Sequence, residues 1–253
     1  MRLVFGKLLS WANMIKWISE ETQESEQRCT NWQNFLRQNS CAVGSIKKID
    51  LSFSIPIITD QEGRKFSIDF ISDKKNYHKK KGSLKTELIS KAMGSGKYGL
   101  KVLDLSAGLG IDALFLSQMG YDVTAVERNS IIYLALKTAQ EQLPESEAKK
   151  IKFFYDSALE FLNCTTDSYD VIYFDPMFPE KKKSALSKQE MILFRNLVGT
   201  DNDASDVIDF VLNSKKAKRF VLKRPLKAPP LKQKPQFSFL GKLIRFDIYG
   251  VTK

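Results

Sequence analysis

From about residue 85 onward, short apolar runs alternate with longer segments of helical periodicity, and this alternation constrains the fold more than any other feature of the chain. Buried strands that alternate with helices are typical of a parallel sheet covered by helices on both faces. The sequence therefore predicts an α/β fold with a Rossmann-like, mostly parallel sheet. Strands are predicted over residues 101–105, 122–127, 151–155, 171–175 and 219–223, and helices over 84–93, 112–119, 130–142, 158–162, 188–197 and 204–213.

The two ends of the chain do not follow this alternation. Runs of alternating apolar and polar residues within 236–252 flank Gly241, which predicts an antiparallel hairpin joined to the sheet edge. Similar runs over 43–58 and 65–71 predict a small sheet, and the apolar spacing over 3–18 indicates a helix that covers a core or lies at a membrane interface. We therefore divide the chain into a small N-terminal α+β region, residues 1–84, and a larger domain, residues 85–253.

Composition narrows the class of function. The 253 residues include 40 Lys and Arg against 29 Asp and Glu, a formal net charge of +11, which indicates a polyanionic partner. The three cysteines form no CxxC pair, so neither a disulfide framework nor a metal site is predicted. No apolar run approaches the roughly 20 residues that cross a bilayer, and no small-residue cleavage site marks a signal peptide. We expect a cytoplasmic protein.

A glycine loop follows the first predicted strand of the larger domain. Gly108 and Gly110 stand in the sequence GLGIDA, where the missing side chains allow a tight turn and the close approach of a ligand. A glycine pair after a strand can also be only a turn. However, Glu127 lies 19 residues after Gly108 at the end of the next strand, where a carboxylate can accept hydrogen bonds from both hydroxyls of a ribose. Together these residues predict a site for a nucleoside-containing cofactor.

Two carboxylates beside this loop favour one such cofactor over another. Asp104 precedes the glycines, and Asp112 lies in the first turn of the following helix. Both would repel the pyrophosphate of a dinucleotide, whereas the sulfonium and ammonium cations of S-adenosylmethionine tolerate them. The sequence therefore favours S-adenosylmethionine over a nicotinamide cofactor.

The segment Asp175-Pro176-Met177-Phe178-Pro179 follows a predicted buried strand, at the edge where open α/β sheets bind ligands. The exocyclic amine of a nucleobase is a poor nucleophile because its lone pair is delocalised into the ring. Asp175 can accept hydrogen bonds from this amine and favour a pyramidal nitrogen, Pro176 rigidifies the turn, and Phe178 offers a face for an extruded base. Alternatively, Asp-Pro only ends a strand and Phe178 belongs to the core. The neighbouring cofactor loop favours the catalytic interpretation.

Several short segments give the chain a family signature: LDLSAGLGIDA, VERN, YFDPMFPEKKKSALSKQEM, LVG, VLKRP, APPL and RFDIY. In these segments, over roughly residues 55–253, the chain resembles the bacterial small-subunit ribosomal RNA guanine-N2 methyltransferases of the RsmJ type. DPMFP followed by lysines and SAL is the most specific of them. The resemblance implies a class I methyltransferase fold, S-adenosylmethionine as donor, and a guanine of 16S ribosomal RNA, free or in the small ribosomal subunit, as acceptor.

The resemblance also implies which residues contact the donor. These are Ile111, Asp112, Glu127, Arg128, Ser157, Ala158 and Asp175. Two positions depart from the family pattern, because Ile111 stands where an arginine is common and Ala158 where a serine is common. Any contact at these two positions is therefore expected through the backbone.

Basic residues gather next to the predicted catalytic segment and in the C-terminal part of the chain. Nine basic residues and no acidic one lie between residues 215 and 234. Such residues neutralise RNA phosphates, although a lysine run can also be only a solvated surface. The lone histidine and its lysines resemble a family segment, and we predict a phosphate or backbone contact there rather than a general base. The residues predicted to contact RNA are His78, Lys79, Lys80, Lys181, Lys182, Lys183, Lys223 and Arg224.

These observations predict an enzyme that transfers a methyl group from S-adenosylmethionine to N2 of a guanine in 16S ribosomal RNA. Three alternatives remain. An adenine-N6 methyltransferase of DNA or RNA would use the same Asp-Pro-x-Phe segment. A nicotinamide-dependent oxidoreductase is disfavoured by the acidic loop, and an RNA-binding protein without activity is disfavoured by the intact Asp175.

Overall fold

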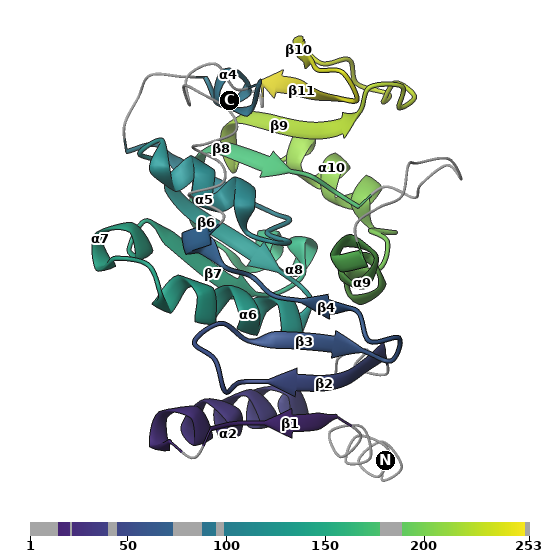
Figure 1. Cartoon of the computed structure of the whole chain (residues 1–253). Helices are drawn as coiled ribbons and strands as arrows, with labels where there is room; N and C mark the ends of the chain where they lie inside the picture. Colours follow the sequence, from purple (N-terminus) through teal and green to yellow (C-terminus); the bar gives the residue numbers. More distant parts are fainter. Residues whose placement is uncertain are drawn as a thin grey trace, which may run out of the picture. The chain divides into compact units, whose positions relative to one another are not determined.

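A seven-stranded sheet organises the larger part of the chain in the computed structural model, which describes residues 15–20, 22–39, 45–72, 88–94, 99–177 and 189–250 (Figure 1). The strands are β5 (Lys101–Asp104), β6 (Asp122–Glu127), β7 (Ile151–Tyr155), β8 (Tyr169–Phe174), β9 (Ala217–Pro225), β10 (Phe237–Leu240) and β11 (Ile244–Gly250). Their order is β10-β11-β9-β8-β5-β6-β7. Neighbours from β9 to β7 are parallel, whereas β10 and β11 form an antiparallel hairpin beside β9. The predicted mostly parallel sheet with a C-terminal antiparallel hairpin is confirmed.

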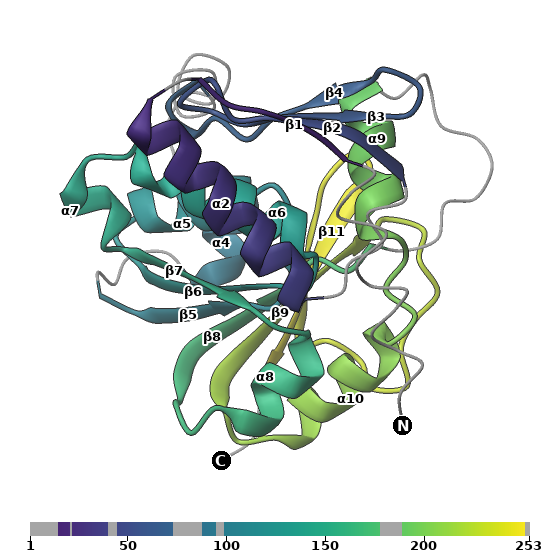
Figure 2. The ribbon, with the colours of Figure 1, turned by 90° about the horizontal axis from the view of Figure 1, so that it is seen from below.

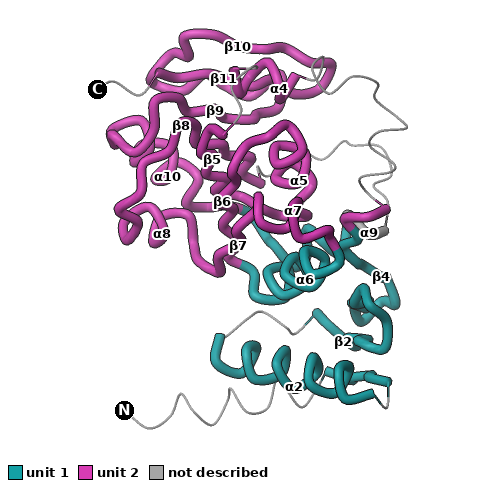
Figure 3. The backbone as a smooth tube through the Cα atoms, turned by 90° about the vertical axis from the view of Figure 1, so that its left-hand side faces the viewer, with its two compact units in different colours: residues 1–69, 129–142, 179–200 teal, residues 70–128, 143–178, 201–253 magenta. Residues whose placement is uncertain are grey.

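The chain divides into two units (Figure 3). One unit comprises residues 1–69, 129–142 and 179–200, and the other comprises residues 70–128, 143–178 and 201–253. The seven-stranded sheet lies wholly in the second unit. The boundary that we predict at residues 84 and 85 lies outside the described residues and stays a prediction.

Helices cover both faces of the seven-stranded sheet (Figure 2). The helices of this unit are α4 (Leu88–Met93), α5 (Ile111–Gln118), α7 (Glu145–Ala148), α8 (Ala158–Cys164) and α10 (Ala204–Asn213). On one face, α8 and α10 contribute Leu162, Val207 and Val211 to a buried cluster that includes Phe220 of β9. On the other face, α5 packs against β6 and β7, and α4 against the C-terminal hairpin. The central strands β5 and β8 are almost continuously buried, which explains their continuous apolar sequences.

In the other unit, the described residues form a small four-stranded sheet and three helices. The strands β1 (Lys16–Ile18), β2 (Ile46–Asp50), β3 (Ile57–Asp60) and β4 (Lys65–Phe66) lie in this order, and the helices are α2 (Gln23–Gln38), α6 (Ser130–Glu141) and α9 (Gln189–Val198). Phe35 of α2 stacks on Tyr133 of α6 with 5.4 Å between ring centroids, and Phe66 packs on Phe194 of α9 at 6.0 Å. The predicted small sheet is confirmed.

One N-terminal expectation is wrong where the structure describes it. The helix that we expect over residues 3–18 is a strand at its end, because Lys16–Ile18 pairs in parallel with β2 and places Trp17 opposite Ile49. Aromatic and β-branched side chains such as these favour strand pairing. The sequence also does not predict α2, which begins after Thr22, whose side chain accepts a hydrogen bond from Ser25 N–H. Within the described ranges, no helix is long and apolar enough to cross a membrane.

Candidate active site

Strands of the parallel sheet bring acidic side chains and a lysine to one edge. Asp104 ends β5, Glu127 ends β6, and Asp175 directly follows β8. The register pairs Phe174 with Leu222, so Asp175 comes beside Lys223 of β9. The order of the strands reverses between β5 and β8, and open α/β sheets bind ligands at the carboxyl edge at such a point. This edge is the candidate active site.

The glycine loop has the backbone conformation that requires glycine. Gly108 and Gly110 have φ angles of 54° and 73°, in the left-handed region that side chains disfavour, and Gly110 caps the N-terminus of α5. The Gly108 N–H donates a hydrogen bond of 2.9 Å to Oε2 of Glu127, a side chain that is only 4% exposed. Glu127 therefore organises the loop, and its carboxylate lies where we expect the ribose of a nucleoside.

Asp104 is a buried carboxyl with an unusual environment. Its Oδ1 accepts hydrogen bonds from the Ser106 N–H at 3.0 Å and the Ser106 hydroxyl at 3.3 Å. Its Oδ2 is buried and makes no hydrogen bond with the part of the chain that the structure describes. Burial raises the pKa of Asp104 to about 7 against the opposing effect of the Ser106 hydrogen bonds. A buried oxygen of this kind suits a cationic ligand group.

Asp112, Asp175 and Lys223 form a connected ionic cluster. Lys223 Nζ lies 2.7 Å from Asp175 Oδ2 and 3.3 Å from Asp112 Oδ2, and Tyr173 OH donates to the same Asp112 oxygen at 2.6 Å. Burial raises the pKa of Asp175, while the Lys223 ammonium lowers it. Burial also lowers the pKa of Lys223, but its two carboxylate neighbours outweigh this effect and raise it above the usual value. Lys223 is therefore fully charged at neutral pH.

Hydrogen bonds hold the described residues 175–177 that follow β8. Asp175 N–H donates to Ser106 Oγ at 2.8 Å, Pro176 is buried, and Met177 N–H donates to Asp201 Oδ2. Sequence reasoning missed Asp201, which comes before α10 and far from Met177 in the chain. The signal was present as an aspartate at the start of a predicted helix, but nothing in the sequence pairs it with this segment.

The remaining predicted donor contacts lie just after β6, after β7 and at the start of α5. Arg128 forms ion pairs with Asp201 and, at 3.3 Å, with Asp203. Ser157 caps α8, because its Oγ accepts from Glu160 N–H at 3.2 Å, and Ala158 is the first residue of that helix. Ile111 begins α5 and is 39% exposed beside the glycine loop. The structure thus brings the predicted donor residues to one edge of the sheet.

The predicted RNA contacts are brought together only in part. Lys223 reaches the edge, but its ammonium binds Asp175 and Asp112. Arg224 points away from this cluster, is 4% exposed, and donates to the carbonyl of Pro229 and to Asp247. This geometry favours a structural role for Arg224 over an RNA contact. The other predicted RNA contacts lie outside the described residues: His78, Lys79, Lys80, Lys181, Lys182 and Lys183. The predicted stacking residue Phe178 also lies outside them.

These residues fit S-adenosylmethionine. The glycine loop has a backbone without side chains at Gly108 and Gly110, Glu127 lies beside it, and the buried Asp104 oxygen has no hydrogen-bond partner among the described residues. Asp104, Asp112 and Asp175 bring three carboxyl groups to this edge, and such groups suit the sulfonium and ammonium cations of the donor. In contrast, no group of three or more histidine, cysteine, aspartate or glutamate side chains within the described ranges could hold a metal ion.

Comparison with known proteins defines the class. Residues 30–251 match a family model described as "Putative SAM-dependent methyltransferase". The solved structure of a SAM-dependent methyltransferase from Neisseria gonorrhoeae is similar, with a TM-score of 0.68 and 26% sequence identity over 93% of this chain and 95% of that one. The chain is thus an S-adenosylmethionine-dependent methyltransferase with a Rossmann-like sheet, and a nicotinamide-dependent oxidoreductase is excluded.

Two curated relatives define the family within this class. The chain is 44% identical to ribosomal RNA small subunit methyltransferase J of Bdellovibrio bacteriovorus over 196 residues, and this alignment covers 77% of each protein. It is 36% identical to the protein of the same name from Haemophilus ducreyi over 241 residues, and this alignment covers 91% of this chain and 94% of the relative. The chain belongs to the ribosomal RNA small subunit methyltransferase J family.

Proposed function

We propose that this enzyme methylates the exocyclic N2 of a guanine in 16S ribosomal RNA. The observation that carries the proposal is Asp175, a partly buried carboxylate at the carboxyl end of β8, beside the edge that fits the methyl donor. The names of the curated relatives support small-subunit ribosomal RNA as the substrate. This substrate would also place the enzyme in the cytoplasm.

The proposed donor site consists of the residues that line the loop and the edge. When bound, S-adenosylmethionine supplies a methyl group whose bond to sulfur breaks as the amine attacks, and the bonding pair remains on sulfur. Glu127 would accept hydrogen bonds from the ribose, and Asp104 would receive a cationic group of the donor. The donor site would be completed by main-chain atoms at Ile111 and Ala158 and by the side chains of Asp112, Arg128 and Ser157.

Asp175 would act on the target amine. It accepts a hydrogen bond from the N2 amine, which draws the lone pair out of conjugation with the ring, and takes the proton that this nitrogen loses as it forms the new bond to carbon. Pro176 holds the turn, and Phe178 would stack on the extruded base.

A basic surface after β9 supports a nucleic-acid substrate. Lys227, Lys232, Lys234 and Lys242 are exposed, and no acidic residue occurs between Asp209 and Asp247. Exposed lysines of this kind bind phosphates without sequence preference. Together with Lys181, Lys182 and Lys183, and with His78, Lys79 and Lys80, this surface would hold the RNA on either side of the target base.

A transfer assay with three acceptors tests the substrate class. The purified enzyme would be incubated with methyl-labelled donor and, separately, with small ribosomal subunits from a strain lacking its gene, the naked 16S RNA from the same subunits, and duplex DNA. We expect label in 16S RNA and none in DNA. Labelling of DNA alone would favour the adenine-N6 alternative, and no labelling of any acceptor would contradict the proposal.

A further inference from the structure

Lys223 connects the candidate catalytic carboxylate to the start of α5. Its Nζ bridges Asp175 Oδ2 at 2.7 Å and Asp112 Oδ2 at 3.3 Å, and Tyr173 OH holds the same Asp112 oxygen at 2.6 Å. The four side chains come from β8, the segment that follows it, α5 and β9. A hydrogen-bonded network of this kind fixes the orientation of each of its members.

These contacts do not suit an RNA-binding lysine. The side chain of Lys223 is 22% exposed, whereas Lys227, Lys232 and Lys234 further along the chain are exposed. A phosphate would have to compete with two carboxylates that already bind the ammonium. The geometry therefore directs Lys223 toward Asp175 rather than toward a polyanion.

We propose that Lys223 is a positioning residue for methyl transfer, because its ammonium binds Oδ2 of Asp175 and so reserves Oδ1 of that carboxylate for the target amine. This inference rests on the proposed function of Asp175. Among the described residues, no side chain or backbone group bonds to Oδ1, which is consistent with that oxygen serving a substrate.

The charges around Asp175 explain why a cation is needed there. Burial raises the pKa of Asp175, Asp112 from α5 and Asp201 from the segment before α10 raise it further, and Lys223 opposes them. Asp104 of β5 interacts with Asp175 as a like charge, and Tyr173 of β8 is a neutral donor. Without Lys223, the remaining charged groups are carboxylates, and they favour protonation of Asp175. A carboxyl oxygen that carries a proton no longer accepts the hydrogen of the amine.

The transfer itself requires an ionised acceptor. The N2 lone pair forms the bond to the methyl carbon, the carbon–sulfur bonding pair stays on sulfur, and N2 loses one proton to Asp175, which passes it to water. Lys223 neither gives nor takes a proton in this step. Its contribution is the ionisation state and orientation of Asp175.

Carboxyl NMR of the free protein tests this inference without any transfer. We would titrate ¹³C-aspartate-labelled wild type, Lys223→Met and Lys223→Arg, with Asp175→Asn to assign the signal. We expect the midpoint of Asp175 to rise by about one pH unit or more in Lys223→Met and to stay near wild type in Lys223→Arg. The same midpoint in all three proteins would overturn the proposal.

The kinetic consequence separates positioning from the two other roles. In Lys223→Met, the pH at which kcat reaches half its maximum should rise by the same amount as the Asp175 midpoint, about one pH unit or more, and kcat should recover at higher pH, with the affinity for S-adenosylhomocysteine retained. Lys223→Arg should restore the wild-type pH profile. A loss of kcat that is equal at every pH and accompanied by a lower Tm would indicate a structural role for Lys223. A raised KM for RNA with an unchanged pH profile would indicate a phosphate contact. Either result contradicts the inference.

The two proposals can fail separately. If the wild type transfers methyl to a different acceptor, the proposed function fails, and the Asp175 midpoints and the pH profile on that acceptor still decide the role of Lys223. If the wild type methylates guanine N2 but the midpoints coincide, only the inference about Lys223 fails.

Discussion

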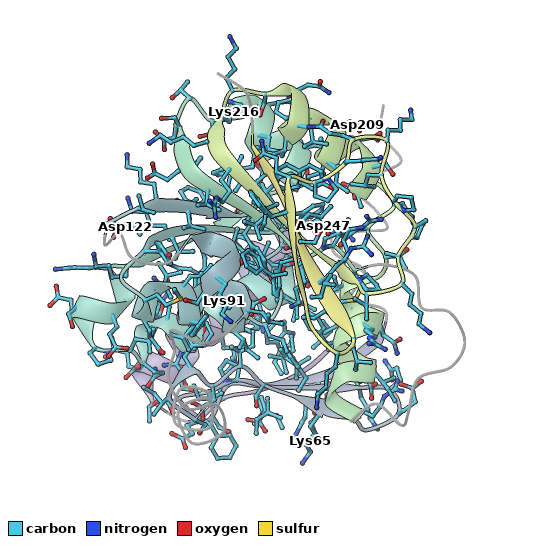
Figure 4. The ribbon with its side chains drawn as sticks, turned by 90° about the horizontal axis from the view of Figure 1, so that it is seen from above. Lys65, Lys91, Asp122, Asp209, Lys216 and Asp247 are labelled. Carbon is cyan, nitrogen blue, oxygen red and sulfur yellow. The ribbon has the colours of Figure 1, made fainter. Side chains whose placement is uncertain are left out.

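Lys223 and Arg224 are neighbours in β9, and each binds an aspartate, yet their surroundings differ. Side chains of successive strand residues point to opposite faces. Lys223 joins Asp112 and Asp175 at the edge, with side chains 22%, 33% and 37% exposed. Arg224 lies with Asp247 of β11, which is labelled in Figure 4, and both side chains are almost completely buried.

The two clusters also differ in what their carboxylates bind. Asp247 accepts from the Ser238 hydroxyl at 2.7 Å and from Arg245 Nε at 3.0 Å, in addition to its contact with Arg224. These bonds join β9, β10 and β11. At the edge, Asp112 and Asp175 share one lysine and remain partly exposed. The same ion-pair chemistry therefore joins strands where it is enclosed, and leaves carboxylates within reach of a ligand where it lies at the edge.

The largest expected effect is on the functional side. Asp175→Ala should lower methyl transfer by roughly 10²–10⁴-fold, because the acceptor for the amine proton is lost, while the Tm stays near wild type. Asp170→Ala is a matched control, since Asp170 lies at the other end of β8 and pairs with Lys218 of β9 at 2.7 Å. Turnover of both variants on small subunits, with thermal unfolding, is the measurement. Substantial turnover in Asp175→Ala would show that the carboxylate is not catalytic.

The opposite result is expected on the structural side. Asp247→Ala leaves the buried Arg224 guanidinium without its carboxylate, and breaking such a buried pair costs roughly 3–5 kcal/mol of unfolding free energy. Thermal unfolding should show a Tm lower by about 10 °C, and the fraction that remains folded should keep its turnover per molecule. Asp247→Asn, which preserves an acceptor, should lose less. A Tm equal to wild type would contradict the structural assignment.

Glu127 is buried like Arg224 and Asp247, yet it lies at the functional edge. Glu127→Ala should weaken donor binding by about ten- to a hundredfold, since a charge-assisted hydrogen bond is lost. RNA affinity should change little. Calorimetric titration with S-adenosylhomocysteine measures the effect, with Glu127→Gln as a control that keeps an acceptor for Gly108 N–H. Donor affinity equal to wild type would mean that the ribose is held elsewhere.

The smallest effect expected is a pH dependence of donor binding through Asp104. The pKa of this carboxyl is raised to about 7 in the free protein, and a bound cation lowers it, so binding displaces a proton at low pH. Affinity should therefore increase by up to about tenfold between pH 6 and pH 8 and level off above. Titrations in buffers of different ionisation enthalpy should detect the released proton. Asp104→Asn should abolish this dependence; its persistence in that variant would assign it to another group.

Local patterns were enough to predict much of the fold. The strands over residues 122–127 and 151–155 and the helix over 204–213 have the predicted bounds, because each is a regular apolar pattern between clear turn or capping signals. The helix α2 was missed because its buried face is narrow, with only Trp32 and Leu36 as buried apolar residues. Its polar composition hides the helical period.

The candidate site was predictable where single segments carry it and not where distant segments meet. Gly108, Gly110 and Asp175 each follow a strand, so their positions at the edge follow from the α/β pattern alone. The pairing of Lys223 with Asp175 depends on the register between β8 and β9, strands that α9 and α10 separate in the chain. For the same reason, the sequence could not distinguish an edge-facing Lys223 from an enclosed Arg224.

If the edge at Asp175 delivers a methyl group to guanine N2, the product nucleoside is N2-methylguanosine, and its identity can be measured. Small subunits from a strain lacking the gene would be incubated with the wild-type enzyme and a deuterated-methyl donor, and the 16S RNA digested to nucleosides for mass spectrometry against synthetic standards. We expect the deuterated methyl group in N2-methylguanosine. Label in N6-methyladenosine, or in a guanosine methylated at another atom, would contradict it.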